Sequence, residues 1–306
     1  EVLGSAAELR AMFKVPAEQQ HQLSDGVCFA RWIGSGSGLP VILLGGGTGC
    51  ALFYKAFAEK LSAQYNGPVL IWDRFNIGFS DRVPNNGLVL WTRQMLELMD
   101  ILAIKKAHLA CFSLASISGA YFAVEHPSRV ARIALVSPIL GGVRQDTQLS
   151  KQIQKMVKVP SCLRGCLGEI IFKRKLVPRL YQRCEGQVKE GGDPDGLPVA
   201  KQMYRVRGTA RSFVEYMLLD ETFITYQTKG AFELVKRLCQ LKIPVLQRNY
   251  LQDKDVDRLG FVKIVGMLAE DGHPACIAEE KPGEHHMFYV DDMRATLAGF
   301  FQAHSG

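Results

Sequence analysis

No apolar run in the 306 residues approaches the ~20 residues that a membrane-spanning helix needs. The chain contains eight cysteines, but none has metal-ligand spacing, and Cys162 and Cys166 form the only close pair. These absences exclude a membrane span and predict no bound metal and no cofactor. Lone buried thiols in a reducing, cytoplasmic setting are the favoured interpretation of the cysteines.

Motifs for phosphate and nucleic acids are also missing. The segment GGGTG at 45–49 has neither the lysine of a phosphate loop nor the G-x-G-x-x-G spacing of a dinucleotide site. Basic residues are not interleaved with aromatic ones, and no groove-reading motif is present. We therefore expect a small-molecule partner and no nucleic acid. No secretory leader opens the chain, which begins at Glu1, and a targeting segment trimmed before Glu1 stays an open alternative.

Strand-like and helix-like segments alternate along the chain. Short apolar, β-branched runs predict buried strands at 41–45, 68–72, 107–112, 129–138 and 243–247, with another near 274–283. Apolar residues at helical spacing predict helices at 50–65, 88–102, 113–126 and 231–241. This alternation is typical of an α/β protein whose mostly parallel central sheet is covered by helices on both faces.

One serine, Ser113, lies between a predicted strand and a predicted helix. Such a turn strains the backbone, and bulky residues two positions away would collide with the strand or helix, so small residues are needed there. Cys111 and Ala115 occupy these positions, which matches the G-x-S-x-G pattern in size but not in letter. The segment predicts a nucleophile, although a serine among small residues is also typical of a plain helix N-cap.

Over roughly residues 20–139 and 230–304 the chain resembles the α/β-hydrolase family. That family ends its first core strand in H-G-x-x-G, and this chain has glycine at 45 in place of the histidine. Its next loop reads D-x-R-G-x-G-x-S, where Asp73, Gly78 and Ser80 fit and the middle departs. LVSP at 135–138 matches the family closely. Because the histidine normally braces its loop, the resemblance implies a roomier or looser pocket floor here.

The resemblance also implies an acid and a histidine later in the chain, in the order Ser, Asp, His. Asp253 is placed as in the D-x-x-V turn of the family, with Asp255 and Asp257 open as alternatives two or four residues away. A solvated acidic loop is the other interpretation of this segment. The P-G-x-x-H pattern places His286 on the catalytic position, while His285 lies in an exposed loop or the pocket wall.

These residues predict acyl transfer. His286 would accept the proton of Ser113 and Asp253 would orient the imidazole. The backbone N–H groups of Gly47 and Leu114 would bind the oxyanion. The predicted substrate pocket is lined by Gly46, Thr48, His285 and Met287.

Residues 140–230 form an insertion, predicted as a helical cap between core segments 1–139 and 231–306. Its helical periodicity covers 149–159, 167–184 and 211–227, with a polar break at 185–198. About 15 lysines and arginines against about 7 acids at 141–215 concentrate the net charge of +7 here. This charge indicates either a solvated helical face or steering of an anionic or carrier-linked substrate.

The sequence thus predicts a serine hydrolase that cleaves an ester or thioester of a small or medium acyl substrate. Acyl transfer to another acceptor and carbon–carbon bond hydrolysis of a diketone are alternatives, because the same triad supports both. A ligand-binding protein with weakened catalysis is a third, favoured by the missing glycines and histidine. Substrate identity, acyl length and oligomeric state stay open.

Overall fold

The structure, a computed structural model, describes residues 3–47, 49–84, 87–139, 174, 177–189, 191–209, 212, 229–253, 266, 276–282 and 291–303. Its centre is an eight-stranded sheet in the order β1-β2-β4-β3-β5-β6-β7-β8. The two pairs that involve β2 are antiparallel, and all other neighbouring strands are parallel. The predicted fold class, an α/β-hydrolase fold with a mostly parallel sheet, is confirmed.

The six predicted strands all lie in this sheet, as β3 to β8. Their bounds are Val41–Leu44, Val69–Trp72, Ala107–Phe112, Val130–Val136, Val245–Tyr250 and Cys276–Lys281. The sheet also contains β1 and β2, at Gln20–Gln22 and Val27–Ile33, which were not predicted. In β2 the polar residue Arg31 interrupts the apolar residues and Trp32 is exposed, so its pattern is less regular than that of the central strands.

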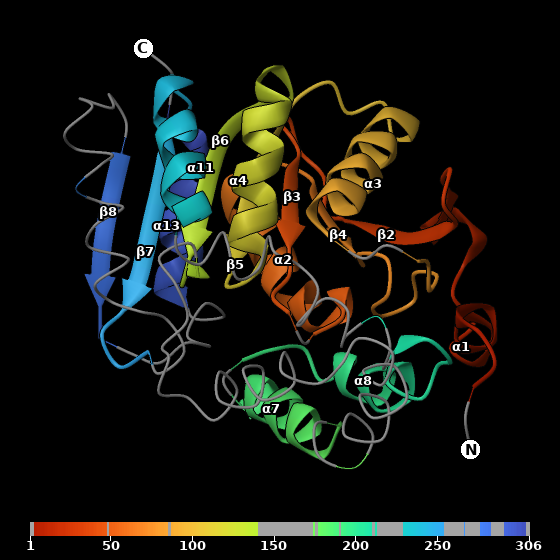
Figure 1. The fold of residues 1–306 in the computed structure, drawn as a ribbon. Helices are drawn as coiled ribbons and strands as arrows, with labels where there is room; N and C mark the ends of the chain where they lie inside the picture. Colours follow the sequence, from red (N-terminus) through yellow and green to blue (C-terminus); the bar gives the residue numbers. More distant parts are fainter. Residues whose placement is uncertain are drawn as a thin grey trace.

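Helices cover both faces of the sheet (Figure 1). One face carries α3, α4 and α11, at Leu88–Ile101, Ala115–Glu125 and Lys229–Gln240. The other face carries α2 and α13, at Lys55–Tyr65 and Asp291–Gln302, which pack against each other. Shorter helices are α1 at Ala6–Met12, η1 at Ala17–Gln19, η2 at Ala51–Tyr54 and η3 at Pro127–Arg129.

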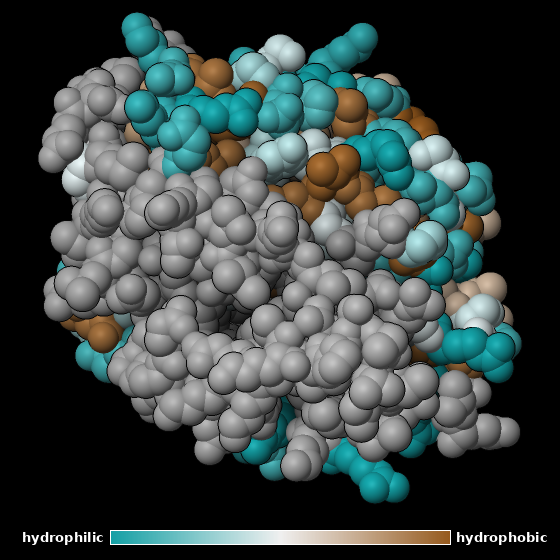
Figure 2. Space-filling model, viewed as in Figure 1, coloured by the Kyte–Doolittle hydropathy of each residue, from teal (hydrophilic) through white to brown (hydrophobic). Residues whose placement is uncertain are grey.

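Burial explains this arrangement. Every residue of β3, β4 and β5 is buried, because helices cover both of their faces. Two apolar clusters result, one between the sheet and α3, α4 and α11, the other between the sheet and α2 and α13. Figure 2 shows hydrophilic residues over much of the described outer surface, with hydrophobic side chains visible near α3 and α4. Helix α3 buries one face and exposes the other, whereas nearly every residue of α4 is buried.

Two helices of the insertion, α7 at Val177–Lys189 and α8 at Gly196–Met203, lie beyond the carboxyl ends of the parallel strands (Figure 1). The N–H of Asp193 donates to the carbonyl of Phe53 at 2.9 Å, and the Asp193 carboxylate accepts from the Ala56 N–H at 3.1 Å. An ion pair between Lys55 and Asp195 adds a third link, at 2.7 Å. This part of the insertion is thus attached directly to the start of α2.

The predicted polar break at 185–198 is wrong in extent. Helix α7 continues through Lys189, and α8 already begins at Gly196. The helix continues past Cys184 because its buried face continues: Gln187 is buried, and Val188 packs against the core. The predicted helices at 149–159 and 211–227 lie outside the described residues. The described basic side chains of the insertion are exposed, at Arg174, Arg179, Lys189, Lys201, Arg205 and Arg207.

The prediction of lone buried thiols is confirmed for the described cysteines, whereas the reducing setting stays a prediction. Cys28, Cys50, Cys111, Cys184 and Cys239 are buried and form no disulfide. Burial raises the pKa of Cys28 to about 12 and that of Cys111 still further, so neither is a reactive thiolate. Across the part of the chain that the structure describes, no helix has the length and apolarity required to span a membrane.

A buried histidine lies at the amino-terminal part of β5. The ring of His108 stacks on Phe301 of α13 with centroids 4.8 Å apart and meets Tyr65 of α2 edge-on. Burial, and then the charges of Arg132 and Lys106, lower the pKa of His108 to about 4. The folded protein therefore keeps this imidazole neutral in acid solutions that would protonate it in the unfolded chain.

We predict that His108→Gln makes the free energy of unfolding fall less steeply as the pH is lowered. Between about pH 6.5 and 4 the unfolded wild type binds the His108 proton and the folded state does not, so wild-type stability falls in that window by about 3 kcal/mol from this group. Urea unfolding of both proteins at pH 7.5, 6, 5 and 4 measures the difference. Other titrating groups contribute to both proteins alike, so identical profiles would contradict the assignment.

Candidate active site

Ser113 lies on a sharp turn between β5 and α4. Its φ is +54°, in the left-handed region that residues other than glycine seldom adopt. Its N–H donates to the carbonyl of Val136 at 2.8 Å, and its carbonyl accepts from the Ser116 N–H at 3.0 Å. The strand ladder on one side and the helix on the other thus hold the strained residue in place. Ser113 is only partly buried, although its neighbours on both sides are buried.

The departures from glycine at this turn are accommodated by packing. Cys111 lies opposite Gly119 of α4, where an added Cβ would lie 2.2 Å from the Cys111 Sγ. The helix therefore lacks a side chain at the point where the strand carries a larger one than glycine. Ala115 is fully buried at the start of α4. The strand and helix approach closely without glycine at 111 or 115, as the small residues predict.

The predicted acid lies on the same edge of the sheet. Asp253 follows the carboxyl end of β7, is 8% exposed, and its N–H donates to the Tyr250 carbonyl at 3.1 Å. Strand β6 lies between β5 and β7, so the turns that carry Ser113 and Asp253 are separated by one strand. The alternatives Asp255 and Asp257 and the predicted residues Thr48, His285, His286 and Met287 lie outside the described residues.

The glycine turn after β3 borders Ser113. A Cβ at Gly46 would lie 3.5 Å from the Ser113 Cβ, and one at Gly47 would lie 3.0 Å from the Leu114 Cδ2. The structure thus brings together Ser113, Leu114, Gly46 and Gly47, as the sequence predicts. The expectation of a roomier or looser pocket floor stays a prediction, because Thr48, His285 and Met287 of the predicted pocket lie outside the described residues. A Cβ at Gly45 would lie 2.8 Å from the Cε2 of Tyr54, so the tyrosine ring fills the space beside this glycine.

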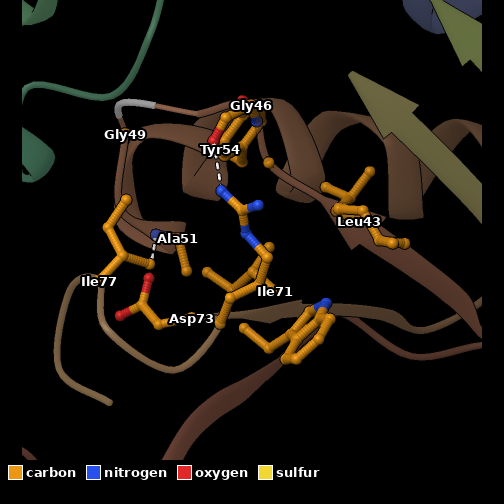
Figure 3. A pocket seen from close by; sticks show the side chains of 12 residues that line it. Leu43, Gly46, Gly49, Ala51, Tyr54, Ile71, Asp73 and Ile77 are labelled. Carbon is orange, nitrogen blue, oxygen red and sulfur yellow. Dashed lines mark hydrogen bonds between the residues drawn. The ribbon is translucent and has the colours of Figure 1, made fainter. Parts of the chain in front are cut away.

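A buried carboxylate, that of Asp73, holds two segments next to the glycine turn. Asp73, 1% exposed, accepts hydrogen bonds from the N–H of Ala51 at 2.7 Å and from the N–H of Phe79 at 2.8 Å; the first is drawn in Figure 3. Burial raises the pKa of Asp73 to about 6, and the N–H groups of Phe79 and Ala51 oppose that rise. Gly78 has a φ of +53°, and a Cβ there would lie 2.0 Å from Asp73 Oδ2. Both Asp73 and Gly78 therefore belong to the support of the turn.

A small cavity lies between Asp73 and the glycine turn (Figure 3). Its free space of about 10 Å³ suits a single water molecule and is too small for an acyl substrate. Two side chains that line it, Tyr54 and Arg74, contact Gly46 and were not predicted as site residues. In the sequence, Tyr54 belongs to a helical pattern and Arg74 to the loop after β4. A signal for Arg74 is its place beside Asp73, two residues after the end of that strand; none marks Tyr54.

The arrangement combines a serine held in a strained turn with backbone groups close to it. Such a serine can attack an electrophilic carbon once a base accepts its proton, and neighbouring N–H groups can bind the resulting oxyanion. Among the described residues, no group of three or more histidines, cysteines or acids could hold a metal ion.

Comparison with known proteins agrees with this geometry. The family model described as alpha/beta hydrolase fold matches residues 40–160, which include the glycine turn and Ser113. The chain has the α/β-hydrolase fold. It is 33% identical over 158 residues to a 2-hydroxy-6-oxononadienedioate/2-hydroxy-6-oxononatrienedioate hydrolase from Comamonas testosteroni, covering 47% of this chain and 54% of that protein. The chain spans about half the length of the curated relatives it matches.

Solved structures of this α/β-hydrolase fold cover nearly the whole chain. A serine hydrolase from Cycloclasticus zankles superposes with a TM-score of 0.67 at 16% identity, over 92% of this chain and 96% of that one. The enol-lactonase from Burkholderia xenovorans LB400 superposes with a TM-score of 0.64 at 15% identity, over 93% of this chain and 100% of that one. At these identities the likeness establishes the fold, including its course on both sides of the insertion.

We predict that Gly119→Ala destabilises the folded protein through a steric overlap with Cys111. The added methyl overlaps the sulfur at 2.2 Å and forces a shift, which should cost about 1–3 kcal/mol of unfolding free energy. In the Cys111→Ala background the same change should cost much less, because the nearest remaining Cys111 atom is the Cβ at 3.3 Å. Urea unfolding of the four proteins gives the coupling energy, and additive effects would show that the pair does not set the helix–strand distance.

Proposed function

We propose that this chain is a serine hydrolase that cleaves an ester or thioester through an acyl-Ser113 intermediate. The observation that carries the proposal is the left-handed φ of +54° at Ser113, on a strand-to-helix turn beside Gly46. A strained, partly exposed serine is costly to maintain and serves to present a nucleophile. The hydrolase relatives support the same class of reaction.

In the proposed mechanism, Ser113 Oγ attacks the acyl carbon while His286 takes its proton. Asp253 orients His286 and stabilises the imidazolium. The N–H groups of Leu114 and Gly47 bind the tetrahedral oxyanion. The imidazolium then protonates the leaving alcohol or thiol, and a water molecule, deprotonated by His286, releases the acid and restores Ser113.

The insertion at 140–230 is proposed to act as the cap that selects the substrate. Its exposed basic side chains support a small or medium acyl substrate that is anionic or linked to an acidic carrier. Long-range attraction of this kind is screened by salt. Substrates that differ only in the charge of the leaving group, assayed at low and high ionic strength, separate steering from a solvated helix face.

Carbon–carbon bond hydrolysis is a second candidate, favoured by the Comamonas testosteroni relative, whose name describes hydrolysis of 2-hydroxy-6-oxo-dienoates. The same three side chains would serve that reaction, in which the leaving group is a carbon rather than an oxygen or sulfur. Parallel assays with p-nitrophenyl esters, acyl thioesters and a 2-hydroxy-6-oxo-dienoate, the last followed by loss of its absorbance, distinguish the two.

We predict that a fluorophosphonate labels the wild type once and labels neither Ser113→Ala nor His286→Ala. The phosphorus bonds to Ser113 Oγ and fluoride leaves, which requires a serine activated by its base. Intact mass spectrometry measures the adduct, and Ser116→Ala, which alters a buried serine in the same helix, is the matched control and should label fully. Hydrolysis by Ser113→Ala should fall by at least about 10⁴-fold.

Absence of labelling in the folded wild type would contradict the proposal and would favour a ligand-binding protein. Labelling that persists in Ser113→Ala would place the nucleophile elsewhere. Three single variants show which aspartate orients His286. We expect Asp253→Asn to lower the labelling rate strongly, and Asp255→Asn and Asp257→Asn to leave it unchanged.

A further inference from the structure

Both backbone groups of Gly46 are held by side chains from other parts of the chain. The N–H of Gly46 donates to the Tyr54 Oη at 3.0 Å, and the Arg74 Nη2 donates to the Gly46 carbonyl at 3.1 Å. Tyr54 ends η2, and Arg74 follows β4 after one residue. Figure 3 shows Tyr54 beside Gly46 in this arrangement. The turn that borders Ser113 therefore has its orientation set from two sides.

The carbonyl of Gly46 and the N–H of Gly47 belong to one peptide group. That group is planar and trans, so the N–H points opposite to the carbonyl. Arg74 holds the carbonyl on the side of the small cavity, and the Gly47 N–H is therefore directed away from Arg74. Because Gly46 and Gly47 also border Ser113 and Leu114, this N–H lies at the edge of the nucleophile's turn.

Arg74 brings a positive charge to the Gly46 carbonyl as well as fixing its orientation. Arg74 is 8% exposed, and its Cζ lies 4.4 Å from the centroid of the Trp91 ring, which keeps the guanidinium in place. A cation that donates to a carbonyl draws electron density toward the oxygen and makes the N–H of the same peptide a stronger donor. In this low-dielectric position, Arg74 would strengthen the hydrogen bond that Gly47 can give.

Tyr54 occupies the place that a larger residue at position 45 would need. Its ring is 2% exposed and stacks on Phe112, the residue before Ser113, with centroids 5.4 Å apart. The Gly45 Cβ position lies only 2.8 Å from its Cε2. A side chain at 45 and this tyrosine therefore exclude each other. The ring reaches the turn from η2, and its hydroxyl binds the peptide on the amino-terminal side of Gly46.

We propose that Tyr54 and Arg74 are positioning residues that orient the Gly46–Gly47 peptide as an oxyanion donor, with Arg74 also polarising it. The inference rests on the proposed function, because it assigns the Gly47 N–H a role in that reaction. It explains how the chain keeps a donor at this turn with glycine at position 45. It also gives the buried cation Arg74 a role in the rate of the reaction.

The test compares Tyr54→Phe, Arg74→Met and Arg74→Lys with the wild type. Tyr54→Phe keeps the ring and removes the acceptor for the Gly46 N–H, and Arg74→Lys keeps the charge. Matched controls at the opposite end of the sheet are Tyr65→Phe, which loses a hydrogen bond to the Leu39 carbonyl, and Arg132→Met, which loses one to Ala303. Circular dichroism and urea unfolding check that each variant folds.

We expect Tyr54→Phe and Arg74→Met to lower kcat by about 10- to 100-fold for the best ester of the panel, with KM changed less than about twofold. The inhibition constant of an alkyl boronic acid, which forms a tetrahedral adduct with the serine, should rise by a similar factor. Arg74→Lys should recover part of the loss. Neither control should change kcat or boronate binding, because a general loss of stability does not act selectively on the tetrahedral state.

Wild-type labelling by the fluorophosphonate tests the proposed function first. If the wild type is labelled but Tyr54→Phe and Arg74→Met keep wild-type kcat and boronate binding, the positioning role is wrong and the hydrolase proposal stands. The same holds if the two controls lose as much activity as the test variants. If the folded wild type is neither labelled nor active, the proposed function fails and the positioning role fails with it.

Discussion

The buried carboxylate of Asp73 connects the parts of the chain on which the candidate site depends. One oxygen accepts from the start of η2, the segment that carries Tyr54, and the other accepts from the loop at Phe79. Gly78 must be glycine because the carboxylate occupies the space of its side chain. The charge is costly to bury, which is why the pKa of Asp73 rises to about 6, and the N–H groups of Phe79 and Ala51 offset part of that cost. Tyr54 and Arg74 reach Gly46 from segments that this carboxylate holds.

The common end at which the parallel strands finish determines which residues can act together. In parallel strands all carboxyl ends lie at one edge, so the turns after β3, β5 and β7 bring the glycine turn, Ser113 and Asp253 to the same side of the molecule. The insertion begins after β6, at this same edge, and its described helices lie beyond the strand ends (Figure 1). The described helices of the insertion and the turn at Ser113 thus lie at the same end of the strands because of topology, whatever their separation in sequence.

Departures from family motifs are matched by changes elsewhere in the fold. The larger residue Cys111 faces Gly119, and the smaller residue Gly45 faces Tyr54. In each pair a glycine leaves the space that the larger neighbouring side chain occupies. Close packing requires such compensation, because an interior tolerates neither an overlap nor an empty space. A motif read one position at a time therefore underestimates how well the turn can be preserved.

The sequence by itself determined the α/β class, the six strands β3 to β8, and the turn at Ser113, because local hydrophobic runs and small residues report those features directly. It did not predict β2, in which Arg31 interrupts the apolar residues, or the continuation of α7 past Glu185. Only the tertiary structure decided that Tyr54 fills the space beside Gly45 and that Arg74 holds the Gly46 carbonyl. These contacts join residues eight or more positions apart, and no local spacing or propensity encodes them, because they arise where separate elements meet.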